Sequence, residues 1–350
     1  MPRPFPRRRA AAFALGLAAL APALLSALAP APAAAQEGVE ELLSGLSYPW
    51  DVARHGDAIY ITEKDGTLGI LSGGAFTRRP VRSAVPILSH RGGGLMGLAL
   101  TPDFETSGRV ILYHHAGTPD SRFNRVIEAE RRGDEWVETR ELVARIPGHP
   151  LYNGGRVAFG PDGMLYVATG WTERRAAPRD LSDLAGKILR LTPDGGVPAD
   201  NPFPGSPVWS LGHRNPQGIA WDGAGVMYAA EHGQSGHDEV NRIEKGGDYG
   251  WPEIQGDDAR GDMRAPLAHS GGSTWAPSGL AWDGDRLLVA GLRAQGLLEV
   301  TPGGDVTRIP LGARIRDVDA AGDGILVITT QRSPRREGPS RDRLLRLERR

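Results

Sequence analysis

One pattern returns six times between Tyr48 and Thr330 and limits what this chain can fold into. Each copy has a corner with Gly or Pro, an apolar strand, a turn rich in Asp and Gly, and a second apolar strand. Apolar and polar residues alternate within the copies, as around Val157 and Phe159, which is typical of half-buried strands. The copies begin at Tyr48, Gly94, Gly154, Asn215, Ala276 and Arg314.

Several copies continue into a third and a fourth strand, for example "KILRLTPDG" from Lys187 and "GLLEVTPGG" from Gly296. Four short strands repeated about every 50 residues are typical of the blades of a β-propeller. A β-sandwich whose turns resemble one another by chance is the alternative, and repeats in unbroken order disfavour it. We therefore predict an all-β fold, a six-bladed β-propeller over residues 36–350, which closes when the C-terminal strand "DRLLRLER" pairs with an early strand.

The first 35 residues differ in composition from the rest of the chain. Arg3 and Arg7–Arg9 are followed by the apolar stretch "AAAFALGLAALAPALLSALA" and by the small residues "APAAA". This order is that of a cleavable signal peptide, and Pro22 and Pro30 disfavour the alternative of a membrane-spanning anchor. We predict a signal peptide at 1–35 and a mature protein that is periplasmic or secreted. No later stretch is long and apolar enough to predict a membrane span in the mature chain.

Composition excludes several classes of function. A formal net charge of -1 gives no basic surface for nucleic acid. The chain has no cysteine, which excludes a thiolate metal site, a cysteine nucleophile and disulfides. It also has no Gly-rich phosphate loop and no G-x-S-x-G motif, so the sequence does not support dinucleotide binding or serine hydrolase chemistry.

Polar side chains concentrate at the corners of the repeats. In a propeller the first strands of the blades ring a central channel, so the corner residues meet on one face although they are far apart in the sequence. Arg214, Arg314 and Arg316 lie at such corners, and Arg293 lies at the end of an inner strand of the fifth repeat. Guanidinium groups in one funnel repel one another unless an anion lies among them, and arginine binds carboxylates through two parallel hydrogen bonds. Separate surface arginines with local partners are the alternative.

The densest polar loop combines acidic residues, histidines and glycines just after the strands of the fourth copy. It contains Glu231, His232, His237, Asp238 and Glu239. Carboxylates interleaved with accessible backbone carbonyls suit a hard cation such as Ca²⁺. A zinc site would need a third ligand beyond the two histidines. A long loop held by its own hydrogen bonds is the alternative.

Several motifs in this order resemble those of one enzyme family: "GGLMGLALTPDF", "GKILRLTPDG" with "DNPF", "GHRNPQG", "HDEVNRIEKGGDYGWP", "APSGLAW" and "RIRDV". That family is the soluble quinoprotein sugar dehydrogenases, exported glucose and aldose dehydrogenases that use pyrroloquinoline quinone (PQQ). The resemblance runs from "YPWDVA" to the C-terminus. It implies a six-bladed propeller that oxidises the anomeric carbon of an aldose to a lactone, with hydride transfer to the quinone. The electron acceptor and the oligomeric state are not implied.

The resemblance assigns roles to the corner and loop residues. The family's cofactor carries carboxylates, which the arginines would bind. The residues implied to contact the quinone are Arg214, Asn215, Thr274, Arg293, Arg314 and Arg316. The backbone carbonyls of Gly233 and Gln234 are implied to hold an active-site Ca²⁺ ion. Glu239 and the Tyr249 carbonyl are implied to hold a second, structural Ca²⁺ ion.

Two departures from the family affect the catalytic side. The family's general base is the histidine of an H-x-G-G-R corner, where this chain has Tyr152. A phenol with a pKa of about 10 is a poor base at neutral pH, so His149, upstream on the same corner, is the candidate substitute. The family also places Gln or Glu where this chain has Gly92.

Two alternative functions remain open at this point. The departures at Tyr152 and Gly92 favour a propeller that binds quinone, a sugar or a protein partner without turnover. A metal-dependent sugar lactonase is the other alternative. A single hard cation does not need several converging arginines, which disfavours the lactonase.

Overall fold

The computed structural model describes residue 1 and residues 38–334 and 340–349. Apart from Met1, the predicted signal peptide at 1–35 lies outside the described residues. The described residues form 24 β-strands, one short helix, α1 (Phe104–Ser107), and one 3₁₀ turn, η1 (Ala177–Arg179). The predicted all-β class is therefore confirmed. In this part of the chain, neither helical segment is long and apolar enough to cross a membrane.

The strands form four separate four-stranded sheets and one eight-stranded sheet. The eight-stranded sheet has two four-stranded halves, which meet through a short parallel pairing of β5 with β9. Four sheets and two halves make six four-stranded units among the described residues, and we call these units blades.

Each blade runs from an inner to an outer strand. Blade 1 comprises β2 (Pro49–His55), β3 (Ala58–Glu63), β4 (Thr67–Ser72) and β5 (Ala75–Arg82). Blade 2 comprises β6 (Leu95–Leu100), β7 (Arg109–Gly117), β8 (Arg122–Arg132) and β9 (Glu135–Pro147). Blade 3 comprises β10 (Gly154–Phe159), β11 (Leu165–Thr169), β12 (Ile188–Leu191) and β13 (Val208–Ser210).

The remaining blades follow in chain order. Blade 4 comprises β14 (Pro216–Trp221), β15 (Met227–Glu231), β16 (Glu239–Ile243) and β17 (Ala268–His269). Blade 5 comprises β18 (Pro277–Asp283), β19 (Arg286–Gly291), β20 (Gly296–Val300) and β21 (Val306–Pro310). Blade 6 comprises β22 (Ile315–Asp319), β23 (Ile325–Thr329), β24 (Asp342–Leu347) and β1 (Val39–Leu46).

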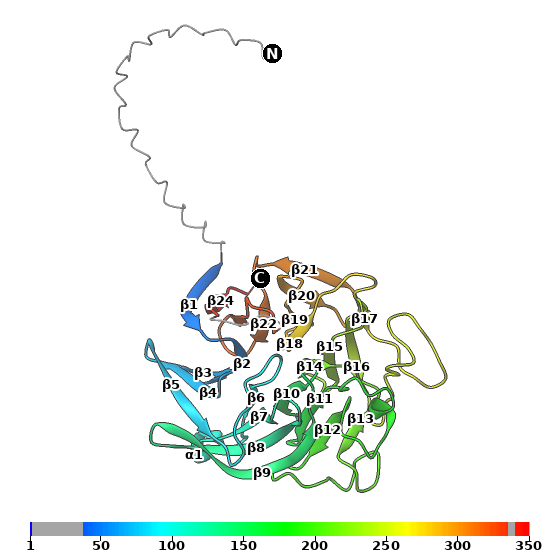
Figure 1. Cartoon of the computed structure of the whole chain (residues 1–350), viewed down its shortest axis with the longest axis horizontal. Helices are drawn as coiled ribbons and strands as arrows, with labels where there is room; N and C mark the ends of the chain where they lie inside the picture. The colour runs from blue at the N-terminus through cyan, green and yellow to red at the C-terminus, as the bar shows by residue number, and fades with distance from the viewer. Residues whose placement is uncertain (2–37, 335–339, 350) are drawn as a thin grey trace. The chain divides into compact units, whose positions relative to one another are not determined.

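The inner strands close a ring. Each lies beside the inner strand of the next blade, in the order β2, β6, β10, β14, β18 and β22, and β22 lies beside β2 (Figure 1). Neighbouring inner strands approach so closely that glycine is required at their contact. A Cβ atom on Gly97 would collide with the carbonyl oxygen of Gly155, and one on Gly218 with that of Ser278. The corners that precede these strands therefore lead into one ring.

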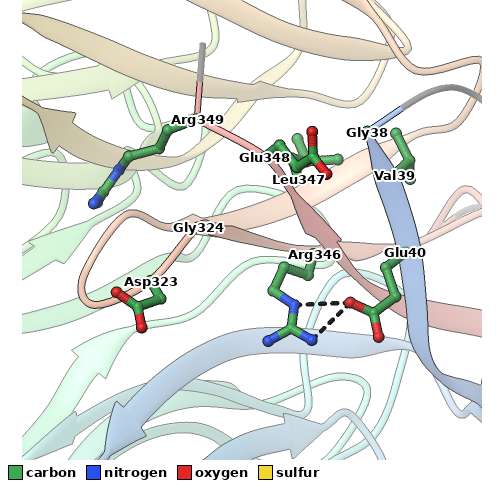
Figure 2. Close-up of a pocket in the computed structure, with 9 residues that line it drawn as sticks. All are labelled: Gly38, Val39, Glu40, Asp323, Gly324, Arg346, Leu347, Glu348 and Arg349. Atoms are coloured by element: carbon green, nitrogen blue, oxygen red, sulfur yellow. Dashed lines mark hydrogen bonds and ion pairs between the residues drawn. The ribbon is translucent and has the colours of Figure 1, made fainter.

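The ends of the described chain complete blade 6. β24 pairs with β23 on one side and with β1 on the other, from Val39 opposite Leu347 to Leu46 opposite Asp342. This confirms the prediction that the C-terminal strand pairs with an early one. A cavity of about 470 Å³ lies beside this closure, next to the ion pair between Glu40 and Arg346 (Figure 2). None of the predicted site residues lines it.

Lys187 is fully buried immediately before β12. Its ammonium group donates hydrogen bonds to the carbonyl oxygens of Ala177 at 2.6 Å and Ala185 at 2.8 Å. Burial lowers the pKa of Lys187 from 10.5 to about 8. Below pH 8 the lysine is charged in both states, so the folded state carries the full penalty of the buried charge. The penalty disappears as the pH rises from about 8 to 10.5, because the folded state releases the proton first.

We therefore expect the stability of the wild type, relative to a Lys187→Met variant, to increase with pH across this range. The increase should be about 3 kcal/mol between pH 8 and pH 10.5. Tyrosines also titrate near the upper end of this range, but both proteins contain the same tyrosines, so their effect cancels in the difference in stability. Urea denaturation at several pH values measures the difference. A difference that stays flat or falls would contradict the lowered pKa.

Candidate active site

The corner arginines converge around His232, which follows β15 and to which the sequence assigned no role. Burial and the charges of Arg214, Arg316 and Arg314 together lower the pKa of His232 to about 4, although Asp238 opposes the shift. The Nη1 atom of Arg214 donates to the carbonyl of His232 at 3.0 Å, and the charges of Arg314 and Arg316 act on the same imidazole. Burial lowers the pKa of Arg314 most, and the charge of Arg293 lowers it as well. Side chains from the corners of blades 4 and 6 and from the turn between β19 and β20 of blade 5 thus meet at one place.

None of these arginines has a carboxylate oxygen within 4.0 Å among the described residues. Their partners are neutral oxygens. Arg316 donates to the side chains of Gln217 at 3.0 Å and Ser278 at 3.3 Å. Arg314 donates to the backbone carbonyl of Thr330 at 3.0 Å. Their positive charges are therefore not neutralised within the described part of the protein.

Burial makes such charges unfavourable. Arg316 is 4% exposed and Arg214 is 8% exposed, and the Nε atom of each is buried without a hydrogen-bond partner. Burial lowers the pKa of Arg316. A buried charge without a counter-ion costs on the order of several kcal/mol, which an anionic ligand would offset. These residues therefore fit a cofactor that carries carboxylates, such as PQQ.

Arg156, which the sequence did not single out, shows the opposite arrangement. It lies between Asp51 of β2 at 2.7 Å and Asp317 of β22 at 2.8 Å, so its charge is neutralised within the protein. Its Nε atom donates to the carbonyl of Gln217 at 2.9 Å. Asp51 also accepts a hydrogen bond from the backbone amide of Leu98 at 2.9 Å. This network joins the inner strands of five blades.

A cavity of about 390 Å³ begins at this network and is lined by the later residues of the inner strands, most of them aliphatic. Burial raises the pKa of Asp51 well above its usual value, and Arg156 opposes that rise. The network of Asp51, Arg156 and Asp317 lies between this cavity and the corners. It forms the floor of the corner site.

The structure shows the contacts of His149, the candidate substitute for the family's base. The Nδ1 atom of His149 accepts hydrogen bonds from the backbone amides of Leu151 at 3.1 Å and Tyr152 at 3.2 Å. The Nε2 atom therefore carries the proton, and it lies 3.4 Å from Glu173 Oε2. Burial also lowers the pKa of His149. Both ring nitrogens therefore already have partners, which disfavours a base at this position, and the catalytic roles of His149 and Tyr152 stay predictions.

Gly92 packs directly against the corner that carries Tyr152. Its amide donates to the carbonyl of Pro150 at 2.7 Å. A Cβ atom on Gly92 would lie 3.0 Å from the Cα atom of Leu151 and from the Pro150 carbonyl oxygen, closer than nearly all Cβ contacts. A larger residue at position 92 would therefore push against this corner. The two departures from the family are neighbours in space.

Asp238 connects the polar loop of blade 4 to the corner of blade 5. Its Oδ1 atom accepts from the amide of Gly233 at 2.9 Å, and its Oδ2 atom accepts from the hydroxyl of Thr274 at 2.6 Å. Asp238 is 2% exposed. Asp238 thus holds the turn with Gly233 and Gln234 against the corner with Thr274. Because the Thr274 hydroxyl donates its proton to Asp238, it can only accept a hydrogen bond from a ligand.

The predicted structural calcium site lies in a buried, oxygen-rich cluster. Burial and the charge of Glu231 together raise the pKa of Glu239 to about 8. Asn241 donates to both carboxylates, at 2.9 Å to Glu231 and 3.2 Å to Glu239, while its own Oδ1 atom is buried without a partner. The Tyr249 ring stacks on His213 at 4.7 Å, and His213 lies 2.8 Å from Glu231.

This cluster fits a cation only if backbone oxygens contribute. No group of three or more acidic or histidine side chains in the described residues is arranged to hold a metal ion. The Oδ1 atom of Asn241 is buried without a partner beside the Glu239 carboxyl group, whose pKa is raised, and a hard cation bound there would interact favourably with both.

The sequence did contain a signal for the floor network. Asp51 in "WDVA" and Asp317 in "RDVD" occupy corresponding places in two repeats, each followed by valine. Charged residues at matching positions of inner strands point into the channel together. Arg156 lies in the inner strand of a third repeat.

Comparison with known proteins agrees with this geometry. The family model described as Glucose / Sorbosone dehydrogenase matches residues 46–339. Aldose sugar dehydrogenase YliI of Escherichia coli (strain K12) is 32% identical over 89% of this chain and 94% of that protein. The PQQ-bound form of aldose sugar dehydrogenase from Streptomyces coelicolor is 32% identical, with a TM-score of 0.78 over 89% of this chain and 98% of that chain.

The apo-form of the soluble aldose sugar dehydrogenase of Escherichia coli is 28% identical, with a TM-score of 0.76 over 89% of this chain and 99% of that chain. The family model covers most of the present chain, and these relatives are matched over nearly their whole length. The chain therefore belongs to the glucose/sorbosone dehydrogenase family.

Proposed function

We propose that this chain is an exported, PQQ-dependent aldose sugar dehydrogenase that oxidises the anomeric carbon of an aldose to a lactone. The observation that carries the proposal is the group of corner arginines without carboxylate partners. The PQQ-bound form of a relative supports the choice of cofactor. The composition of residues 1–35 supports export to the periplasm or the medium.

Each group of residues in the site would have a separate role. PQQ would supply the hydride acceptor, and Ca²⁺ on the carbonyls of Gly233 and Gln234 would supply Lewis acidity. Arg314 and Arg316 would bind carboxylates from one side, with Arg293 exposed beside them. The remaining predicted contacts are Arg214, Asn215 and Thr274. Asn215 is held in place because its side-chain oxygen accepts from the amide of Gly154 at 3.0 Å.

Ca²⁺ is expected to stabilise the fold through Glu239. A ligand that binds only the folded state raises the melting temperature by mass action. We expect a chelator to lower the melting temperature of protein prepared with Ca²⁺, and Glu239→Ala to remove most of that response. Glu244→Ala changes an exposed glutamate close by in the chain and should keep the response. If chelator and Ca²⁺ give the same wild-type melting temperature, the structural site is absent.

A propeller that binds the quinone without turnover is the second candidate function. The occupied nitrogen of His149 favours it, because it leaves the family's base without a substitute. The tight packing at Gly92 also favours it, because the corner has little room there for the Gln or Glu of the family. Purified protein with added PQQ and Ca²⁺ distinguishes the two candidates. Quinone binding with dye reduction by aldoses supports the dehydrogenase. Binding without reduction supports the second candidate, and absence of binding contradicts both.

A further inference from the structure

Arg214 lies in an aromatic cage, by which we mean Tyr152, Trp171 and Trp251. The guanidinium carbon of Arg214 is 4.7 Å from the centre of the Tyr152 ring, 5.3 Å from that of Trp251 and 5.8 Å from that of Trp171. The two indole rings meet edge to face, with centres 5.0 Å apart. These distances are those of cation–π contacts.

The backbone holds the two indoles in place. Trp171 follows β11, and its amide donates to the carbonyl of Arg214 itself at 2.9 Å. Trp251 follows β16, and its amide donates to the carbonyl of Gly212 at 2.8 Å. Both indoles are buried. Two walls of the cage are thus fixed to the segment that carries Arg214.

His149 holds the third wall. Its imidazole stacks on the Tyr152 ring with centres 4.9 Å apart and planes within 4°. Its Nδ1 atom accepts from the Tyr152 amide, which fixes the backbone as well. These contacts indicate that His149 holds the phenol ring in position and does not act as a base.

An aromatic cage stabilises a cation without cancelling its charge. A carboxylate would neutralise Arg214, as Asp51 and Asp317 neutralise Arg156. Aromatic faces attract a guanidinium group electrostatically and leave its N–H groups available to a ligand. Nη1 of Arg214 donates to the carbonyl of His232 at 3.0 Å, while Nε is buried without a partner.

We propose that Tyr152 is a positioning residue that acts through its ring rather than its hydroxyl, and that it holds Arg214 charged and oriented towards an anionic cofactor. The inference deepens the proposed function and rests on it for the identity of the anion. It also gives a reason for the departure from the family. A phenol ring in place of an imidazole builds a wall for Arg214 and removes the usual base.

Unfolding of the purified protein without added cofactor tests the contact. Urea midpoints are measured for Arg214→Met in three backgrounds: wild type, Tyr152→Phe and Tyr152→Leu. If the ring holds Arg214, the substitution shifts the midpoint equally in the wild-type and Tyr152→Phe backgrounds and differently in the Tyr152→Leu background. Equal shifts in all three backgrounds overturn the proposal.

Titration with PQQ in the presence of Ca²⁺, followed by tryptophan fluorescence, tests the role. We expect Tyr152→Leu to weaken PQQ binding about tenfold or more, and Tyr152→Phe to stay within about twofold of the wild type. A Tyr152→Phe variant as weak as Tyr152→Leu overturns the proposal, and so does a Tyr152→Leu variant that binds like the wild type. If the wild type does not bind PQQ, the proposed function fails, and the unfolding comparison alone decides for or against the cage.

Discussion

Replacing both Arg314 and Arg316 with alanine is expected to weaken PQQ binding by roughly 3–6 kcal/mol, or on the order of 10²- to 10⁴-fold in affinity. Each guanidinium group would donate charge-assisted hydrogen bonds to a carboxylate, and each such bond contributes about 1.5–3 kcal/mol. Their partners within the protein, such as Gln217, are neutral, so no internal ion pair competes with the ligand. Isothermal titration with PQQ measures the change.

Two exposed arginines provide the matched control. Arg242 of β16 and Arg308 of β21 are exposed, and replacing both with alanine removes the same net charge. Surface charges are largely screened by salt, so this control should bind PQQ within about threefold of the wild type. Unchanged affinity in a folded Arg314/Arg316 double variant would contradict the binding role, as would an equal loss in the control.

Arg156→Met is expected to destabilise the fold by about 3–5 kcal/mol. The substitution removes the cation that lies between Asp51 and Asp317 and leaves two buried carboxylates facing each other. The matched control is Arg346→Met, which breaks the exposed ion pair with Glu40 (Figure 2). Exposed pairs contribute about 0–1 kcal/mol, so the control should unfold almost like the wild type. Urea denaturation of both variants measures the difference, and equal losses would contradict the role of the network.

The loss caused by Arg156→Met should depend on pH. Burial raises the pKa of Asp51 and Arg156 opposes the rise, so removing Arg156 raises this pKa further. A raised pKa in the folded state stabilises the fold at low pH, and this contribution disappears as the pH rises through it. The variant should therefore be closer to wild-type stability at about pH 5 than at about pH 8. A deficit that grows towards acid pH would contradict this assignment.

The fold was predictable because a propeller repeats one local pattern. Turn residues, alternation with a period of two and the spacing of the repeats all involve residues close together in the chain. The pairing of β24 with β1 was predictable as well, since a ring of blades needs a strand to close it. The motifs of the corners were likewise readable, because each is a short run of neighbouring residues such as "GHRNPQG".

The site was only partly predictable. The sequence indicated that Arg214, Arg314 and Arg316 approach one another, since ring geometry alone brings corners together. It could not show that His149 uses its basic nitrogen within its own corner, because that depends on backbone directions in a turn. These contacts disfavour a histidine base at this corner, and the role of His149 stays a prediction.

Local sequence thus specified the strands, the corners and the family, because each depends on residues that are neighbours along the chain. Packing between blades specified which charges are neutralised and which remain available. The amide of Val52 donates to Asp317 across 265 residues, and no local pattern encodes such a pair. Arg156 and Arg316 are both buried arginines of inner strands, yet one lies between two carboxylates and the other has only neutral partners. Ring closure determines this difference, because it alone sets which side chains face one another across the channel.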